Sequence, residues 1–252
     1  EHFLSVAEAM ETFGTDDVSL WDEADGFFYD VLVGPDGHSE PVRLRSLVGL
    51  LPLIAVAHAP DWVTRELPDF VARLRWLQRR RPDLTDALVT TRAEGQVVTS
   101  LAPLTAARAQ ALMTRLFDEG EFLGPHGIRS LSAAYRGGVT LDVAGVSMSV
   151  AYDPGESTTN LFGGNSNWRG PVWFPINVLL IDGLRGHARA AGGSAEVEYP
   201  TGSGRTRGLG EVAGDLEQRL VSLFRPGADG RRPGTPRDHP SGPLWDVHVT
   251  FA

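Results

Sequence analysis

RSLVGLLPLIAVAH, residues 45–58, is apolar on almost every side when wound as a helix, which predicts a helix buried inside the protein. Downstream, Asp61 or Thr64 can cap a second helix that runs through Leu74 and Leu77 to Arg81, where Pro82 ends it. Upstream, residues 18–33 are aromatic and β-like. The turn sequence Gly-Pro-Asp-Gly at 34–37 then predicts a return strand over 39–44.

The rest of the chain repeats this alternation of helix and loop. Apolar spacing predicts an opening helix over 3–13 and further helices over 103–117, 175–191 and 209–224. Residues 96–101 are a candidate strand and 139–152 a β-hairpin, whereas 153–170, 194–208 and 225–243 are long loops. About six helices with long loops are typical of an (α/α)6 toroid. We therefore expect an all-α dominated fold, here a partial barrel with small β-hairpins in its loops.

Composition narrows the function classes. The chain has 252 residues, 42% of them hydrophobic, and a net charge of −9, so phosphate-rich partners such as nucleic acid or anionic membranes are not expected. There is no cysteine and every basic residue is Arg, which removes thiolate metal sites and lysine Schiff-base or P-loop chemistry. The seven His residues form no pair at zinc-ligand spacing, and no cofactor motif is present. No apolar run approaches the ~20 residues of a membrane span. The compartment stays open, with the cytoplasm favoured.

The segment GGNSNWRGPVWFPIN, residues 163–177, is the first candidate binding site. Sugars bind to flat aromatic platforms combined with amide and guanidinium groups, and this segment supplies Asn167, Trp168, Arg169 and Trp173 just before a helix. The alternative is that both Trp side chains belong to the core and the glycines only form turns, which composition alone favours.

Two further segments carry candidate polar groups. LWDEADGFFYD, residues 20–30, places Asp25 between Trp21 and Tyr29, and carboxyl groups beside aromatics can act as acids or accept hydrogen bonds from sugar hydroxyls. A surface acidic turn is the alternative. EFLGPHGIRSLS, residues 121–132, contains a turn with His126, which is either a cleft donor or a structural residue.

These segments, together with EHFLSVAEAM, RSLVGLLPLIAV and EYPTGSG, resemble bacterial members of glycoside hydrolase family 63 in the same order along nearly the whole chain. The resemblance implies a toroid whose pocket is lined by Trp168, Arg169, Trp173 and Asn167, with Trp21, Asp25 and Tyr29 near the same face. It implies inverting hydrolysis of α-glucosyl or α-mannosyl linkages in a small glycoside or oligosaccharide. Two carboxyl groups ~6.5–9.5 Å apart perform that chemistry.

Neither catalytic carboxyl is expected within these residues. The family's acid is an Asp upstream of the position that Glu1 matches, and its base is a Glu just after Ala252. We therefore expect residues 1–252 to be part of a single catalytic domain, truncated at both ends and inactive alone. The alternatives are a non-catalytic carbohydrate-binding module, or a complete small glycosidase that uses Asp30 and Glu156.

Overall fold

The computed structural model describes residues 5–6, 9–10, 18–80, 88–93, 96–143, 145–153 and 172–233. Within these ranges the α-helices are α2 (Asp61–Glu66), α3 (Pro68–Arg80), α5 (Ala106–Leu116), α6 (Phe174–Ala190) and α7 (Leu209–Ser222). Two 3-10 helices accompany them, η1 (Leu47–Ile54) and η2 (Ala133–Gly137).

The strands are short and lie mostly in two-stranded hairpins. The antiparallel pairs are β1 (Trp21–Asp22) with β2 (Phe27–Phe28), β3 (Asp30–Val33) with β4 (Ser39–Val42), β8 (Leu123–Gly124) with β9 (Gly127–Ile128), β10 (Val139–Val143) with β11 (Val146–Val150), and β12 (Glu196–Glu198) with β13 (Thr206–Gly208). One sheet has three strands in the order β5 (Ala57–Pro60), β7 (Gln96–Leu101), β6 (Leu88–Ala93).

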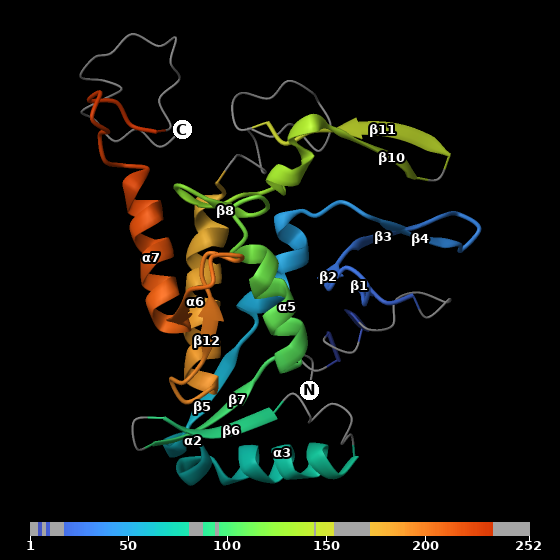
Figure 1. The fold of residues 1–252 in the computed structure, drawn as a ribbon. Coiled ribbons are helices and arrows are strands. Elements are labelled where there is room, and N and C mark those ends of the chain that lie inside the picture. The colour runs from blue at the N-terminus through green and yellow to red at the C-terminus, as the bar shows by residue number, and fades with distance from the viewer. Residues whose placement is uncertain are drawn as a thin grey trace.

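Three helices form the centre of the molecule. In Figure 1, α6 and α7 stand side by side, and α5 and η1 lie to their right. The three-stranded sheet lies below them, with α2 and α3 beneath it. The β3–β4 and β10–β11 hairpins project on the side away from α7. The central helices therefore hold the core, and the hairpins present their edges at its periphery.

The prediction of an all-α toroid is wrong. The described residues form a mixed α/β fold in which hairpins and a three-stranded sheet separate the helices. The reason is that many apolar segments between the helices are too short, or too rich in Gly and Pro, to continue as helix. Residues 27–33 instead form the short strands β2 and β3, in which Phe27 and Phe28 are buried and the β3 residues are largely exposed.

The prediction for residues 45–58 also needs correction. Leu47–Ile54 is a 3-10 helix, after which the chain turns into strand β5. Pro52 inside this segment has no N–H to donate, and its ring crowds the preceding turn. The N–H of Ala55 accordingly bonds to the carbonyl of Pro52, three residues back, at 3.3 Å. The apolar composition predicted burial correctly but not the helix type.

Most of the other predicted elements are confirmed. The helix over 61–81 is present as α2 and α3, interrupted before Pro68. The helices over 103–117, 175–191 and 209–224 correspond to α5, α6 and α7, and the strand over 96–101 is β7. The 139–152 hairpin is β10–β11, with Gly145 at φ 75° in its turn.

Several short elements were not predicted: strand β6, the pairs β8–β9 and β12–β13, and η2. Neither Leu88–Ala93 nor the charged Glu196–Glu198 stands out by periodicity, and the segment 194–208 was expected to be a loop. Of the opening helix, residues 5–6 and 9–10 are helical. The loop over 153–170 and the later part of the loop over 225–243 lie outside the described residues, apart from their first positions.

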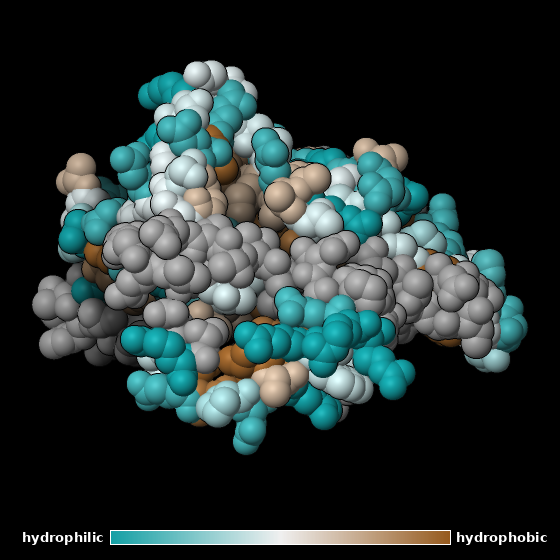
Figure 2. Space-filling model, turned by 90° about the horizontal axis from the view of Figure 1, so that it is seen from below, coloured by the Kyte–Doolittle hydropathy of each residue, from teal (hydrophilic) through white to brown (hydrophobic). Residues whose placement is uncertain are grey.

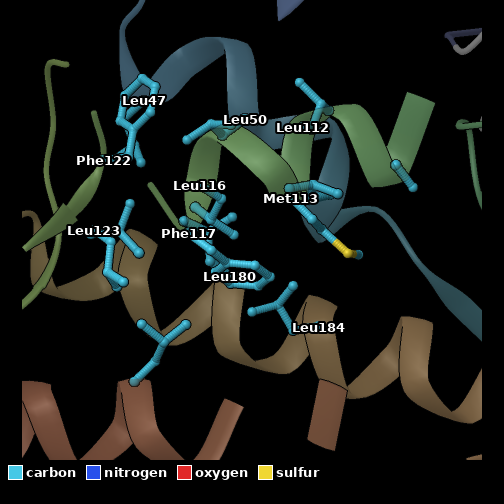
Figure 3. Close-up of a cluster of buried hydrophobic side chains, with 14 of the residues drawn as sticks. Leu47, Leu50, Leu112, Met113, Leu116, Phe117, Phe122, Leu123, Leu180 and Leu184 are labelled. Atoms are coloured by element: carbon cyan, nitrogen blue, oxygen red, sulfur yellow. The ribbon is translucent and has the colours of Figure 1, made fainter. Parts of the chain in front are cut away.

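The core is built from α5, α6, α7, η1 and the aromatic β2 strand. Figure 3 shows Leu112 and Leu116 of α5 in one cluster with Leu180 and Leu184 of α6, and each of these four residues is fully buried. Burying one leucine side chain stabilises a protein by about 1.5–3 kcal/mol. Phe122 belongs to the same buried cluster, so the polar groups described below adjoin this core.

Two glycines permit the closest approaches in this core. A Cβ added at Gly183 of α6 would lie 2.4 Å from the carbonyl oxygen of Leu53, and one at Gly49 of η1 would lie 2.3 Å from the Phe27 ring. Both positions therefore require glycine because of packing. The lower face of the molecule, seen in Figure 2, is mainly hydrophilic with small groups of hydrophobic residues emerging between charged ones.

Candidate functional site

The segment 121–132 connects the separate parts of the fold. Its hairpin is closed by a hydrogen bond from the Arg129 N–H to the Phe122 carbonyl at 2.8 Å. The Leu47 N–H at the start of η1 donates to the Ser130 carbonyl at 2.8 Å, and the Ser132 N–H donates to the Arg45 carbonyl at 3.0 Å. This segment therefore fixes η1 and the chain before it relative to the helices.

Glu121 is the buried carboxylate of this segment, and only 8% of the residue is exposed. Its Oε1 accepts a hydrogen bond from Arg115 at 2.7 Å, and its Oε2 accepts one from the Ser132 hydroxyl at 2.9 Å. Arg45 forms an ion pair with Oε2 at 3.0 Å. Two guanidinium groups and a hydroxyl thus surround the carboxylate, an arrangement typical of a structural or positioning role.

Arg115 links Glu121 to Asp25. Its Nε donates to the backbone carbonyl of Asp25 at 2.9 Å. The Asp25 Oδ2 in turn accepts a hydrogen bond from the Tyr29 hydroxyl at 2.7 Å. Burial is the largest cause of the raised pKa of Tyr29, and the hydrogen bond to Asp25 is the next largest. The hydroxyl therefore stays protonated and donates to Asp25. Asp25 and Tyr29, both predicted site residues, are therefore in direct contact.

A polar rim, composed of Asp22, Asp25 and Arg43, lies at the exposed end of this network. Arg43 is 2.7 Å from the Asp22 Oδ2 and 3.8 Å from the Asp25 Oδ2, and 57% of its side chain is exposed. The Asp22 Oδ1 accepts the backbone N–H of Asp25 at 2.9 Å and of Ala24 at 3.0 Å. The Asp25 N–H hydrogen bond, helped by Arg43, holds the pKa of Asp22 below its usual value. The rim thus presents one exposed guanidinium, paired with two carboxylates whose side chains are 16% and 35% exposed.

Trp21 lies beneath this rim and is not an open platform. The residue is 6% exposed, and its ring packs edge-on against Phe28 at 4.9 Å between ring centres. The Arg108 guanidinium lies 5.0 Å from the indole centre. The alternative interpretation of this indole, as a core residue, therefore fits its surroundings better than a sugar-stacking role.

The second predicted group is only partly described. Trp173 is partly buried at the start of α6 and packs against the main core. Trp168, Arg169 and Asn167 lie outside the described residues, so their relation to Trp173 is not described. The residue before it, Val172, forms a β-bridge with Arg129. Trp173 is thereby connected to the 121–132 segment that also holds Glu121.

Asn177 connects Trp173 to the 121–132 segment. It was not predicted as a site residue. It is 2% exposed, its Oδ1 accepts the Ile128 N–H at 2.6 Å, and its Nδ2 donates to the carbonyls of Ile128 and Trp173, each at 3.0 Å. The signal was available, since Asn177 ends the 163–177 motif four residues after Trp173, one helical turn away. It fastens the α6 N-terminus to strand β9.

Arg129 and His126 also have structural contacts. The buried Arg129 guanidinium donates to the carbonyls of Glu119, Glu121 and Leu123 at 2.7–3.1 Å. The His126 Nδ1 lies 2.7 Å from the Ser222 hydroxyl of α7. Of the two interpretations of His126, the structural one fits this contact, which attaches the β8–β9 turn to α7.

EYPTGSG, residues 198–204, takes part in a separate network. Asp215 accepts hydrogen bonds from the Tyr199 hydroxyl and from the Arg219 Nε, the latter at 2.8 Å, and Arg219 also donates to the Gly124 carbonyl at 2.9 Å. Burial acts to raise the pKa of Asp215, but the Arg219 and Tyr199 hydrogen bonds outweigh it and lower that pKa. This network joins α7 to the β8–β9 turn.

The described ranges contain no group of three or more His, Asp or Glu residues able to hold a metal ion. None of the helices in the described part of the chain is long and apolar enough to cross a membrane. The charged groups of the polar rim can form hydrogen bonds that are stronger than those between neutral groups.

Comparison with known proteins gives one informative relative. No family model matches the chain. It is 37% identical over 269 aligned residues to the uncharacterized protein YMR196W of Saccharomyces cerevisiae. The alignment covers the whole of this chain and 25% of the yeast protein, so the chain spans about a quarter of the length of that relative.

Proposed function

We propose that this chain is part of an inverting α-glycoside hydrolase of the family 63 type, acting on α-glucosyl or α-mannosyl linkages of a small glycoside or oligosaccharide. The observation that carries the proposal is the polar rim, where the exposed Arg43 pairs with the partly buried carboxylates of Asp22 and Asp25, and Asp25 accepts the Tyr29 hydroxyl. Paired carboxylate and guanidinium groups can bind adjacent sugar hydroxyls simultaneously, as acceptor and donor.

In this proposal the described residues bind sugar and do not transfer protons. A general acid needs a raised pKa, whereas the pKa values of Asp22 and Asp215 are lowered. Following the resemblance to family 63, we assign the acid and the base of the reaction to residues outside these 252. Asn167, Trp168, Arg169 and Trp173 are proposed to contribute the remaining contacts to the substrate.

The experiment uses the protein as its gene encodes it, with aryl α-glucosides and α-mannosides as substrates. Hydrolysis with the β-anomer as first product, followed by NMR, is the expected result, since inversion defines the mechanism. Asp25→Asn should raise KM at least fivefold, because it removes a charged acceptor from the rim. Asp182→Asn, at a side chain that is 67% exposed on α6, is the matched control and should leave KM unchanged.

Absence of turnover on the whole panel, or retention of configuration, would refute the proposal. Sugar binding without turnover, still weakened by Asp25→Asn, would instead favour a carbohydrate-binding module. The observation that favours this second candidate is that Asp22 and Glu121 are both held in ion pairs with arginines. Activity abolished by Asp30→Asn would favour the remaining alternative, a complete small glycosidase that uses Asp30 and Glu156. Glu156 lies outside the described ranges.

A further inference from the structure

A groove of about 420 Å³ lies beside the polar rim and is not used by the function proposed above. This volume falls in the ~300–1,000 Å³ range of small-molecule sites in proteins. Its walls come from η1, from the Phe28–Asp30 segment and from the N-terminal helix. Eleven of its fourteen lining residues are apolar or glycine: Val6, Met10, Leu20, Phe28, Leu44, Val48, Gly49, Leu51, Pro52, Ala55 and Pro103.

Only three polar residues, Tyr29, Asp30 and Ser46, line this groove. Ser46 is 5% exposed, and its hydroxyl does not cap η1 or bond to any other described residue. Because Ser46 lines the groove, its hydroxyl is placed to donate to or accept from a ligand there. Asp30 is exposed at the groove and supplies its one carboxylate. The groove therefore combines apolar walls with two groups able to bind a polar head.

Tyr29 joins the groove to the polar rim. The residue lines the groove, while its hydroxyl donates to Asp25 and the Arg43 guanidinium lies 5.9 Å from its ring centre. A ligand bound along Tyr29 would therefore meet charged groups at one end and apolar walls at the other. That is the polarity of a glycoside whose sugar is linked to an apolar group.

We propose that the groove binds the apolar aglycone of a glycoside, an alkyl chain or ring, while the Asp22–Asp25–Arg43 rim holds the sugar. Ser46 and Asp30 hydrogen-bond to the polar part of the ligand near the linkage. This inference rests on the proposed function, since it names the class of substrate. It favours a glycoside with an apolar aglycone over a purely polar oligosaccharide.

The test compares binding of octyl α-glucoside, below its micelle concentration, with methyl α-glucoside by isothermal titration calorimetry on the protein as its gene encodes it. Each buried methylene is worth about fourfold in Kd. Even partial burial of the chain should therefore make the octyl compound bind at least tenfold more tightly. Equal affinities would overturn the inference.

Variants locate the binding. Val48 is 41% exposed on η1 at the groove, and Val48→Arg should abolish the advantage of the octyl chain without altering methyl α-glucoside binding. Val146→Arg is the matched control, because Val146 is 58% exposed on the β10–β11 hairpin and does not line the groove. Ser46→Ala should weaken octyl α-glucoside several-fold. An equal effect of the two arginine variants would contradict a site in this groove.

The outcomes separate this inference from the proposed function. Selective binding of octyl α-glucoside, lost in Val48→Arg, without hydrolysis of any glycoside, would leave the groove assigned and refute the hydrolase. Hydrolysis of methyl and octyl α-glucosides with the same kcat/KM would support the hydrolase and overturn the aglycone groove.

Discussion

Replacing Glu121 by Gln tests whether the network around this carboxylate organises the fold. The substitution keeps the shape and an acceptor for Ser132, but it removes the charge that balances Arg115 and Arg45. Breaking a buried ion pair by neutralising one partner costs about 3–5 kcal/mol. Because the two arginine side chains remain 22–23% exposed, water offsets part of this cost, and we expect a loss of about 2–4 kcal/mol.

Glu217→Gln is the matched control. Glu217 also binds an arginine, Arg185, at 2.7 Å, but 51% of its side chain is exposed. Exposed pairs contribute about 0–1 kcal/mol, so the control should change stability little. The Arg115–Glu121 and Arg185–Glu217 ion pairs have the same length, so the two variants differ in burial and in the additional Arg45 and Ser132 contacts of Glu121.

The measurement is urea unfolding at neutral pH, followed by far-UV circular dichroism. In 1 M NaCl the small effect of Glu217→Gln should vanish, whereas that of Glu121→Gln should persist, because salt screens exposed pairs far more than buried ones. If both substitutions cost the same free energy of unfolding, or if salt abolishes the Glu121 effect, the network is not the organising contact described above.

Two further predictions concern packing and pH. Gly183→Ala should lower the free energy of unfolding in urea by at least about 2 kcal/mol, because its Cβ would collide with the Leu53 carbonyl. Gly214→Ala in α7, where no neighbouring atom lies within 4 Å of the added Cβ, should raise it by about 0.5–1 kcal/mol. Equal effects would count against the close α6–η1 contact. His58 and His187 have buried Nε2 atoms without partners in the described chain, and burial lowers the pKa of both below 6.5. Their contribution to stability is thus present above pH 6.5 and lost as the pH falls through the lowered values. Thermal unfolding midpoints should therefore drop from pH 7.5 to pH 5, and less so in His187→Gln.

Local signals in the sequence predicted most helices because each carries its own start and stop. Thr105 caps α5 by accepting the Arg108 N–H at 3.3 Å, and Gly192-Gly193 follows α6, both with positive φ. The fold class could not be predicted from such local helix signals. It depends on how short apolar segments pair across the chain, as β5 does with β7 some forty residues later. Pro52 further changed a predicted α-helix into a 3-10 helix followed by that strand.

The candidate site was predictable in part for the same reason. Asp25 and Tyr29 are four residues apart within one motif, so their contact is local. Glu121 and Arg45 are separated by 76 positions, and no periodicity relates them. The family resemblance placed Trp21 near the sugar-binding face, and the residue type does not contradict that, since aromatic residues suit both cores and binding sites. Only its burial and its contact with Phe28 distinguish the two.

The position of the polar rim is set by the core through a row of aromatic rings. Tyr29 lies 5.4 Å from Phe27, measured between ring centres, and Phe27 stacks on Phe122 at 5.9 Å. Phe122 adjoins Glu121, whose carboxylate holds Arg115, and Arg115 returns to the backbone of Asp25. The rings and the ion pairs thus form two parallel connections between the 121–132 segment and the rim. A substitution at Phe122 should therefore disturb ligand binding at Asp25 even where the rim residues themselves are unchanged, because both connections start from the same short segment.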